Sequence, residues 1–151
     1  MKYSYRITRY FKYSENGYLT DDGWTSYCDV GKSVSLAEYL NSEEQYISTI
    51  INICKHLNIG CLRVSKLCNS FEKSTVKNKE LISLSNLPEV LRGILREEFW
   101  CKLVHKKCQF HFGYDGYMYC VSEIDLFEFL IKISKLHIEK YPSPYYRKNN
   151  L

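Results

Sequence analysis

The stretch Cys108–Cys120, CQFHFGYDGYMYC, constrains the fold of this chain more than any other part of its sequence. Large side chains alternate on both sides of a short connection flanked by Gly113 and Gly116, and alternation with a period of two is typical of β-strands. The two glycines supply the positive φ values that tight connections require. We therefore predict a β-hairpin, and its aromatic arms favour a position at the centre of a sheet.

This hairpin carries two kinds of side chain. Its arms contain three aromatic residues that we expect in the core, namely Phe110, Phe112 and Tyr119. Its tip contains residues that turn chemistry tends to expose, and they are the first candidate partner-binding residues: Tyr114, Asp115 and Tyr117.

Helical and extended patterns follow one another along the rest of the chain without a regular repeat. Strands are expected over residues 2–13, 18–20, 61–68, 99–105 and 136–140, and residues 24–30 should form either a strand or an extended loop. A short helix capped by Ser35 should precede a longer helix at 43–57, and two further helices should begin near Asn86 and Ser122. Because hairpins require antiparallel pairing, we predict an α+β fold: a mostly antiparallel sheet with an aromatic central hairpin and about three helices packed on one face. The domain should span residues 1–145, with a loose tail at 146–151.

Charge is distributed unevenly along the sequence. The 151 residues have a formal net charge of +4, but the segment from Ser14 to Gln45 contains seven acidic residues and one lysine, a net charge of −6. The remaining +10 comes from scattered bases that form no run typical of a nucleic-acid-binding arm. Such an acidic segment is either a solvated surface or the contact surface for a basic partner. Its candidate partner-binding residues are Glu15, Asp21, Asp22, Asp29, Glu43 and Glu44.

The cysteines and histidines give no sign of a cofactor or a catalytic centre. None of the seven cysteines forms a C-x-x-C pair and no Cys/His cluster has zinc-ligand spacing, so we expect reduced, mostly buried thiols, no metal and no cofactor. Motifs for a nucleophile elbow, a phosphate-binding loop and dinucleotide binding are missing. A cysteine with His105 or His111 as base would suit a hydrolase, but paired surface histidines are the favoured interpretation. The sequence therefore predicts a binding protein and not an enzyme.

The sequence also indicates a cytoplasmic location. No apolar run approaches the ~20 residues that cross a bilayer. The N-terminal segment MKYSYRITRYF alternates like a strand and lacks the apolar core of a signal peptide. We expect no membrane partner.

Four separated stretches stand out in combination. They are Gly23–Tyr27 followed by Asp29–Lys32, Leu95–Glu97 with Trp100, Phe112–Asp115 with Tyr117–Tyr119, and Glu139–Tyr141 with Ser143–Tyr145. Together they resemble a family of small immunity proteins of bacterial polymorphic-toxin and contact-dependent growth inhibition systems. The similarity runs from about Tyr3 to Tyr145, and the FGYD of Phe112–Asp115 is its most specific part. This chain departs from the family at Gly116, where a large and commonly aromatic residue is usual.

The resemblance implies a cognate inhibitor, which binds the C-terminal toxin domain delivered by a neighbouring cell and covers its active site or substrate-binding face. Many such toxins are nucleases, often directed at tRNA, and a nuclease surface is basic where it meets phosphate. The acidic segment would complement such a surface, and no direct nucleic-acid partner is expected. The alternative from another class is a small nucleic-acid-binding module that uses the scattered bases and stacks nucleotide bases on tyrosines.

Overall fold

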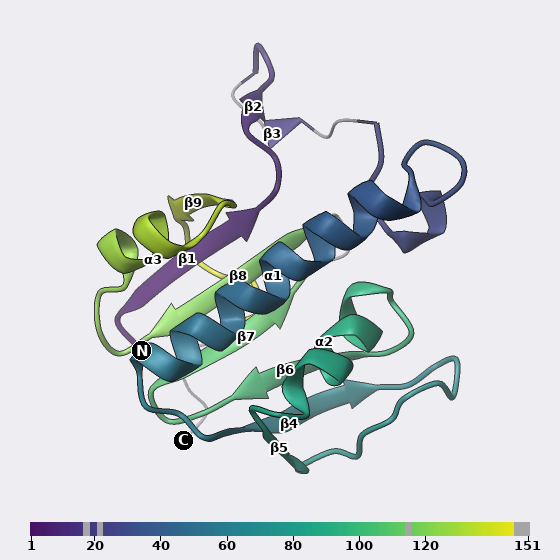
Figure 1. Ribbon diagram of the computed structural model, residues 1–151. Helices are drawn as coiled ribbons and strands as arrows, with labels where there is room; N and C mark the ends of the chain where they lie inside the picture. The colour runs from purple at the N-terminus through teal and green to yellow at the C-terminus, as the bar shows by residue number, and fades with distance from the viewer. Residues whose placement is uncertain (17–18, 21–22, 114–115, 147–151) are drawn as a thin grey trace.

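The computed structural model describes residues 1–16, 19–20, 23–113 and 116–146, and it contains one large antiparallel sheet (Figure 1). The seven strands follow the order β5-β4-β6-β7-β8-β1-β9. Their bounds are β1 Tyr3–Thr8, β4 Cys61–Cys68, β5 Leu81–Ser83, β6 Trp100–Val104, β7 Cys108–Phe112, β8 Tyr117–Ser122 and β9 His137–Lys140. The predicted hairpin is β7–β8, and it lies at the centre of the sheet, as its aromatic arms indicated.

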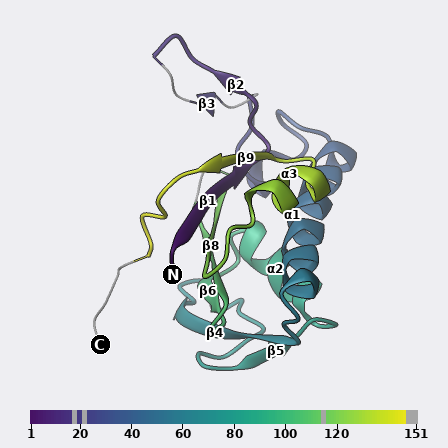
Figure 2. The same cartoon turned by 90° about the vertical axis from the view of Figure 1, so that its left-hand side faces the viewer.

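Three helices cover one face of this sheet: α1 Leu36–His56, α2 Leu87–Leu95 and α3 Phe127–Ile133. Figure 1 shows α1 crossing in front of the sheet with α2 and α3 on either side of it, and Figure 2 shows all three on the same side. A separate two-stranded hairpin, β2 Lys12–Tyr13 with β3 Leu19–Thr20, projects beyond the end of β1. The predicted α+β fold, a mostly antiparallel sheet with helices on one face, is confirmed.

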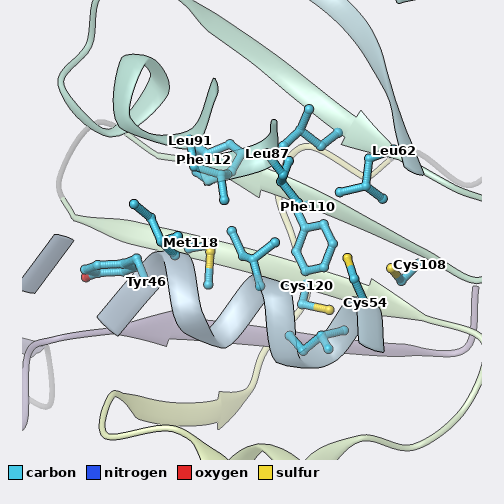
Figure 3. Close-up of a cluster of buried hydrophobic side chains, with 14 of the residues drawn as sticks. Tyr46, Cys54, Leu62, Leu87, Leu91, Cys108, Phe110, Phe112, Met118 and Cys120 are labelled. Atoms are coloured by element: carbon cyan, nitrogen blue, oxygen red, sulfur yellow. The ribbon is translucent and has the colours of Figure 1, made fainter. Parts of the chain in front are cut away.

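The core lies between the sheet and these helices (Figure 3). Phe110 and Phe112 of β7 face the helices and lie opposite Cys120 and Met118 of β8, so every second side chain of the hairpin arms points into the core beneath the helices. From the helices, the core receives a stripe at helical spacing that includes Tyr46, Ile47, Ile50, Cys54 and Leu57 of α1 and Val90, Leu91 and Ile94 of α2. Both stripes have the spacing of an amphipathic helix.

Helix α1 differs from the prediction of two helices. Ser35 caps it as expected, because its hydroxyl accepts a hydrogen bond from the Glu38 N–H at 3.2 Å. The helix then continues through Asn41, since no glycine or proline interrupts residues 36–56 and buried Tyr39 fixes the first turns against Trp24. Asn41, a residue type that often caps helices, is thus exposed in the middle of a continuous helix.

Other boundaries also differ from expectation. Residues 24–30 form no strand. They contain a 3₁₀ turn at Tyr27–Asp29, because the Asp29 carboxylate accepts hydrogen bonds from the N–H groups of Thr25 and Ser26 at 2.8 and 3.2 Å. The first strand ends at Thr8, not at residue 13. The short edge strand β5 was not predicted.

The C-terminal segment, residues 141–146, lies on the face of the sheet opposite the helices (Figure 2). Ser143 anchors this segment with two hydrogen bonds. Its hydroxyl bonds His111 Nδ1 at 2.8 Å, and its backbone N–H donates to Ser4 Oγ at 2.9 Å. Tyr145 packs on Tyr119, which explains why Tyr119 is buried as predicted although it faces away from the helices. Tyr146 begins the expected tail, and its hydroxyl accepts a hydrogen bond from the terminal amino group at 2.7 Å; residues 147–151 lie outside the described residues.

Candidate functional site

A hollow of about 50 Å³ opens at the end of the sheet where β7 leads into β8, which we call the hairpin end. Distant segments of the chain form its wall. They are the loop before α1 (Trp24, Thr25, Ser26), α1 itself (Tyr39, Ser42, Glu43, Tyr46), the end of α2 and the turn after it (Ile94, Leu95, Glu97), the hairpin (Phe112, Gly113, Gly116, Tyr117, Met118) and Arg9.

A second hollow of about 80 Å³ adjoins the first, because four residues line both: Ile94, Glu97, Phe112 and Gly113. Its remaining wall consists of Cys68, Ser70, Phe71, Phe99 and Trp100. The Trp100 side chain is fixed in this wall, because its indole Nε1 donates to the Phe112 carbonyl at 2.8 Å. We call the two hollows together the groove; Glu97 lies at their junction.

An ion pair between Glu43 and Arg96 lies at the wall of the first hollow. Arg96 donates from Nε and Nη2 to the two carboxylate oxygens of Glu43 at 2.8 and 2.9 Å, while Arg92 lies 3.7 Å from the same carboxylate. The Glu43 side chain is only 3% exposed. These hydrogen bonds raise the pKa of the Arg96 guanidinium further above its usual range, and burial together with Glu43 raises the pKa of Tyr39. The pair joins α1 to the end of α2.

Arginines alternate with aromatic rings along the rim of the groove and onto the opposite sheet face. The Arg9 guanidinium lies 3.4 Å from the centre of the Trp24 ring and 4.5 Å from that of Tyr10. Tyr10 meets Tyr117 edge to face, and Arg6 lies 5.0 Å from the Tyr117 ring centre. Such cation–π contacts fix long side chains in place, so the rim is a preorganised surface.

Helix α2 ends in a Schellman motif that has glutamate in place of the usual glycine. The Glu98 N–H donates to the Gly93 carbonyl and the Glu97 N–H to the Ile94 carbonyl, both at 3.0 Å. Glu97 accordingly has a φ of 59°, in the left-handed region. Glycine is favoured there because a Cβ atom is strained in this conformation.

The structure describes five of the nine candidate residues, and two of them, Glu43 and Tyr117, line the first hollow of the groove. Glu15 is exposed in the turn after β2, and Glu44 is exposed on α1; neither lines the groove. Asp21, Asp22, Tyr114 and Asp115 lie outside the described residues.

Two of the acidic candidates prove to be structural. Glu43 was expected in a solvent-facing first turn, but because α1 begins at Leu36, Glu43 falls on the inward face of its third turn and is buried against Arg96. Asp29 caps the 3₁₀ turn, and its hydrogen bonds to the Thr25 and Ser26 N–H groups lower its pKa. The prediction of one continuous acidic contact surface is therefore wrong for these two residues.

The histidines do not pair with each other or with a thiol in the described part of the chain. His111 is fully buried between Ser143 Oγ and Gln109 Oε1, and burial with a smaller effect from Lys102 lowers its pKa to about 3. His105 lies in the turn after β6 and accepts at Nδ1 from the Lys107 N–H at 3.2 Å. Burial raises the pKa of Cys54 and of Cys101 to about 12, which keeps these thiols protonated. The predicted pair of surface histidines is wrong.

Sequence reasoning missed the residues that give the groove its charge and shape, chiefly Arg9, Tyr39, Arg96 and Glu97. A usable signal did exist for Glu97, since residues 94–98, between the helix that begins near Asn86 and the strand expected at 99–105, contain no glycine. The departure at Gly116 also has a structural counterpart. A Cβ atom at this position would lie 3.1 Å from the Tyr10 hydroxyl oxygen, so the Tyr10 ring occupies the space beside the hairpin.

Comparisons with protein-family models, with curated proteins and with solved structures found no match to this chain. Among the residues that the structure describes, no helix combines the length and the apolar character needed to cross a membrane. No group of three or more potential metal ligands occurs in the same part of the chain.

Proposed function

We propose that this protein is a cytoplasmic inhibitor that binds a toxin domain and neutralises it by covering its active site or substrate-binding face. A cognate immunity protein of a polymorphic-toxin or contact-dependent growth inhibition system has this activity. The proposal assigns the groove and its rim at the hairpin end to the toxin contact.

One observation carries the proposal: the stretches on which the family resemblance rests converge in space. Trp24 comes from the first stretch, Glu97 from the second and Tyr117 from the third, and all three line one hollow although more than ninety positions separate the outer two. Tyr145, from the fourth stretch, packs on Trp100 beside the second hollow. Residues that are scattered in sequence and gathered on a surface are expected where a partner binds.

The electrostatics of this end favour a basic partner, in keeping with a nuclease that acts on RNA such as tRNA. Glu38 and Glu44 are exposed on the N-terminal half of α1, and Glu15 is exposed on the neighbouring β2–β3 hairpin. Exposed carboxylates increase the association rate with a basic protein, and salt screens this attraction over ~10 Å at 0.1 M ionic strength. The buried Glu43 has no part in this effect.

The test uses the toxin domain encoded immediately upstream of this chain, purified and mixed with the inhibitor at increasing molar ratio. We expect toxin activity to fall linearly and to end at one equivalent, since a stoichiometric inhibitor does not turn over. The variants Cys101→Ser and His111→Ala should still inhibit once they are folded. Complete loss of toxin activity at a small fraction of an equivalent would contradict the proposal, because it would require an enzyme.

The nucleic-acid-binding alternative gains one specific observation. Arg6 lies between the rings of Tyr117 and Tyr141, at 5.0 and 4.1 Å from their centres. However, Arg6 is ion-paired with Glu139 at 2.6 Å and its side chain is 18% exposed, so its charge is largely neutralised. Binding of a single-stranded RNA oligonucleotide with steep salt dependence would favour this alternative over toxin inhibition.

A further inference from the structure

A hollow of about 460 Å³ lies on the face of the sheet opposite the helices, and its described lining residues are all different from those of the groove. The strand register forms its floor. Arg63 of β4 pairs with Leu81 of β5 and with Val104 of β6, and Val104 pairs in turn with Gln109 of β7. Paired residues point to the same face of a sheet, and the adjacent residues of these strands are buried beneath the helices: Leu62, Leu103 and Phe110. The row therefore faces away from the core, and we call this site the back hollow.

Two cations line the back hollow. Arg63 belongs to the floor and Lys106 to the turn after β6; both residues are exposed, and neither forms an ion pair within the described part of the chain. The described lining residues include no carboxylate. These bases are scattered in the sequence, but strand pairing brings them to one concave surface. Cations gathered in this way raise the local concentration of anions.

Two neutral groups add hydrogen-bond donors to the same hollow. Partial burial, Lys107 and Lys106 lower the pKa of His105, so its ring is neutral at pH 7. Because its Nδ1 accepts from the Lys107 N–H, the ring carries its proton on Nε2. The Gln109 Oε1 is bonded to His111 Nε2 at 3.2 Å, which leaves the Gln109 NH₂ group as a donor. Such a set of cations and donors complements a phosphate group, which has nearly two negative charges at pH 7 and several acceptor oxygens.

The size and the borders of the back hollow favour a small molecule over a nucleic acid. Its volume is within the range of about 300–1,000 Å³ that is typical of small-molecule sites. Leu81, which is 58% exposed, gives the floor an apolar surface for the body of such a ligand. The C-terminal segment covers the same sheet face beside it, since the Tyr145 carbonyl accepts a hydrogen bond from Lys102 (Figure 2). A single strand of RNA needs a basic groove that follows several nucleotides.

We propose that the back hollow binds a phosphorylated small molecule. Arg63 and Lys106 are the ionic contacts of the phosphate group, and His105 and Gln109 are additional donors, while the apolar floor packs on the rest of the ligand. The back hollow is separate from the groove, so this inference is independent of the toxin contact.

The first experiment compares two probes that have the same ring. Phenyl phosphate joins the ring to a phosphate group, and benzoate joins it to a carboxylate. We expect phenyl phosphate to shift the NMR amide signals of residues 104–109 saturably, with a dissociation constant of about 1 mM or lower. Benzoate should bind at least about fivefold more weakly, because it has one negative charge and two acceptor oxygens. Equal binding of the two probes, or no saturation by phenyl phosphate up to about 10 mM, would overturn the inference.

Substitutions of exposed cations test the residues. Arg63→Gln and Lys106→Gln should each weaken phenyl phosphate binding about three- to fivefold, and the double variant should weaken it at least about tenfold, because exposed charge pairs contribute modestly. Lys132→Gln is the matched control, since Lys132 is exposed on α3 and does not line the back hollow. All the variants should keep the wild-type melting temperature, because the three residues are exposed. Wild-type affinity in the double variant, or an equal loss in Lys132→Gln, would contradict the assignment of the two cations.

A ten-nucleotide uridine RNA distinguishes a small molecule from a nucleic acid. We expect it to bind the back hollow more weakly than phenyl phosphate does. Tighter binding of the RNA at residues 104–109, with a steep salt dependence, would mean that the site belongs to a nucleic acid and that the small-molecule assignment is wrong. The toxin domain takes no part in these measurements, so their failure would leave the proposed function unaffected.

Discussion

The Glu43 carboxylate is 3% exposed and ion-paired with Arg96, so its charge acts within the fold and not on a partner. Breaking a buried pair leaves an uncompensated charge, and the penalty is reduced here because the Arg96 side chain is 25% exposed. We predict that Glu43→Gln lowers the free energy of unfolding by about 2–4 kcal/mol.

Urea denaturation measures this loss, and the adjacent exposed residue supplies the control. Glu44→Gln should change stability by no more than about 0.5 kcal/mol. Equal effects of the two substitutions would mean that the Glu43–Arg96 pair contributes nothing specific to the fold.

His111 gives the molecule a pH dependence with a defined sign. Its folded pKa of about 3 lies far below the ~6.5 of an unfolded histidine. The unfolded chain therefore binds the extra proton first as the pH falls below 6.5, so the stabilisation is complete above pH 6.5 and is lost progressively towards pH 3. The slope that His111 contributes should approach about 1.4 kcal/mol per pH unit.

Urea midpoints at pH 7.0, 6.0 and 5.0 separate this contribution from those of the carboxylates, which titrate lower. The groups in contact with His111 include Ser143, Gln109, Lys102 and the rings of Tyr145 and Tyr146. His111→Asn retains a hydrogen-bonding group for Ser143 and should flatten the dependence. An equally steep dependence in the variant would exclude His111 as its source.

Tyr46 connects α1 to the central hairpin. Its hydroxyl accepts from the Arg9 N–H at 2.9 Å and donates to the Gly116 carbonyl at 2.5 Å. Removing this hydroxyl takes one hydrogen-bond partner from the Arg9 N–H and one from the Gly116 carbonyl. Tyr46→Phe should therefore cost about 1–3 kcal/mol.

Thermal denaturation followed by circular dichroism measures that cost. Tyr3→Phe is the control, because Tyr3 is half-buried in the same sheet and its hydroxyl forms no hydrogen bond in the described part of the chain. A stability loss in Tyr3→Phe as large as in Tyr46→Phe would assign the effect to ring packing and not to the two hydrogen bonds.

The elements were predictable where a single physical pattern determines them. Strict alternation gave β4 and the β7–β8 hairpin, and the 3.6-residue stripe gave the buried face of α1. Prediction failed where two local preferences compete. Asn41 can cap a helix or continue one, and burial of Tyr39 decides for continuation; Trp24–Val30 has strand propensity, and the Asp29 hydrogen bonds decide for a turn.

The candidate site was less predictable than the fold, because charge along the sequence does not reveal burial. Glu43 and Glu44 are the same type of residue and adjacent in sequence, yet Glu43 is buried and Glu44 is exposed. The groove needs Trp24, Glu97 and Tyr117 to meet, and only the chain path through α1, α2 and the hairpin brings them together. Family resemblance marked those stretches individually without indicating that they share a surface.

The fold brings distant segments of the chain together in the groove at the hairpin end of the sheet. The helices cover one face of the sheet, and the C-terminal segment lies on part of the other (Figure 2). The groove, its arginine–aromatic rim and the exposed carboxylates of α1 lie towards the hairpin end. We therefore predict that the toxin domain contacts a single surface, at the hairpin end.

Hydrogen–deuterium exchange of the chain, free and bound to the inactive toxin domain, tests this prediction most directly. Binding should slow exchange in segments 23–32, 95–100 and 112–119, while the edge strand β5 and the C-terminal turns of α1 should exchange as in the free protein. Protection confined to β5, to α3 or to the C-terminal half of α1, with the three hairpin-end segments unchanged, would contradict a contact surface at the hairpin end.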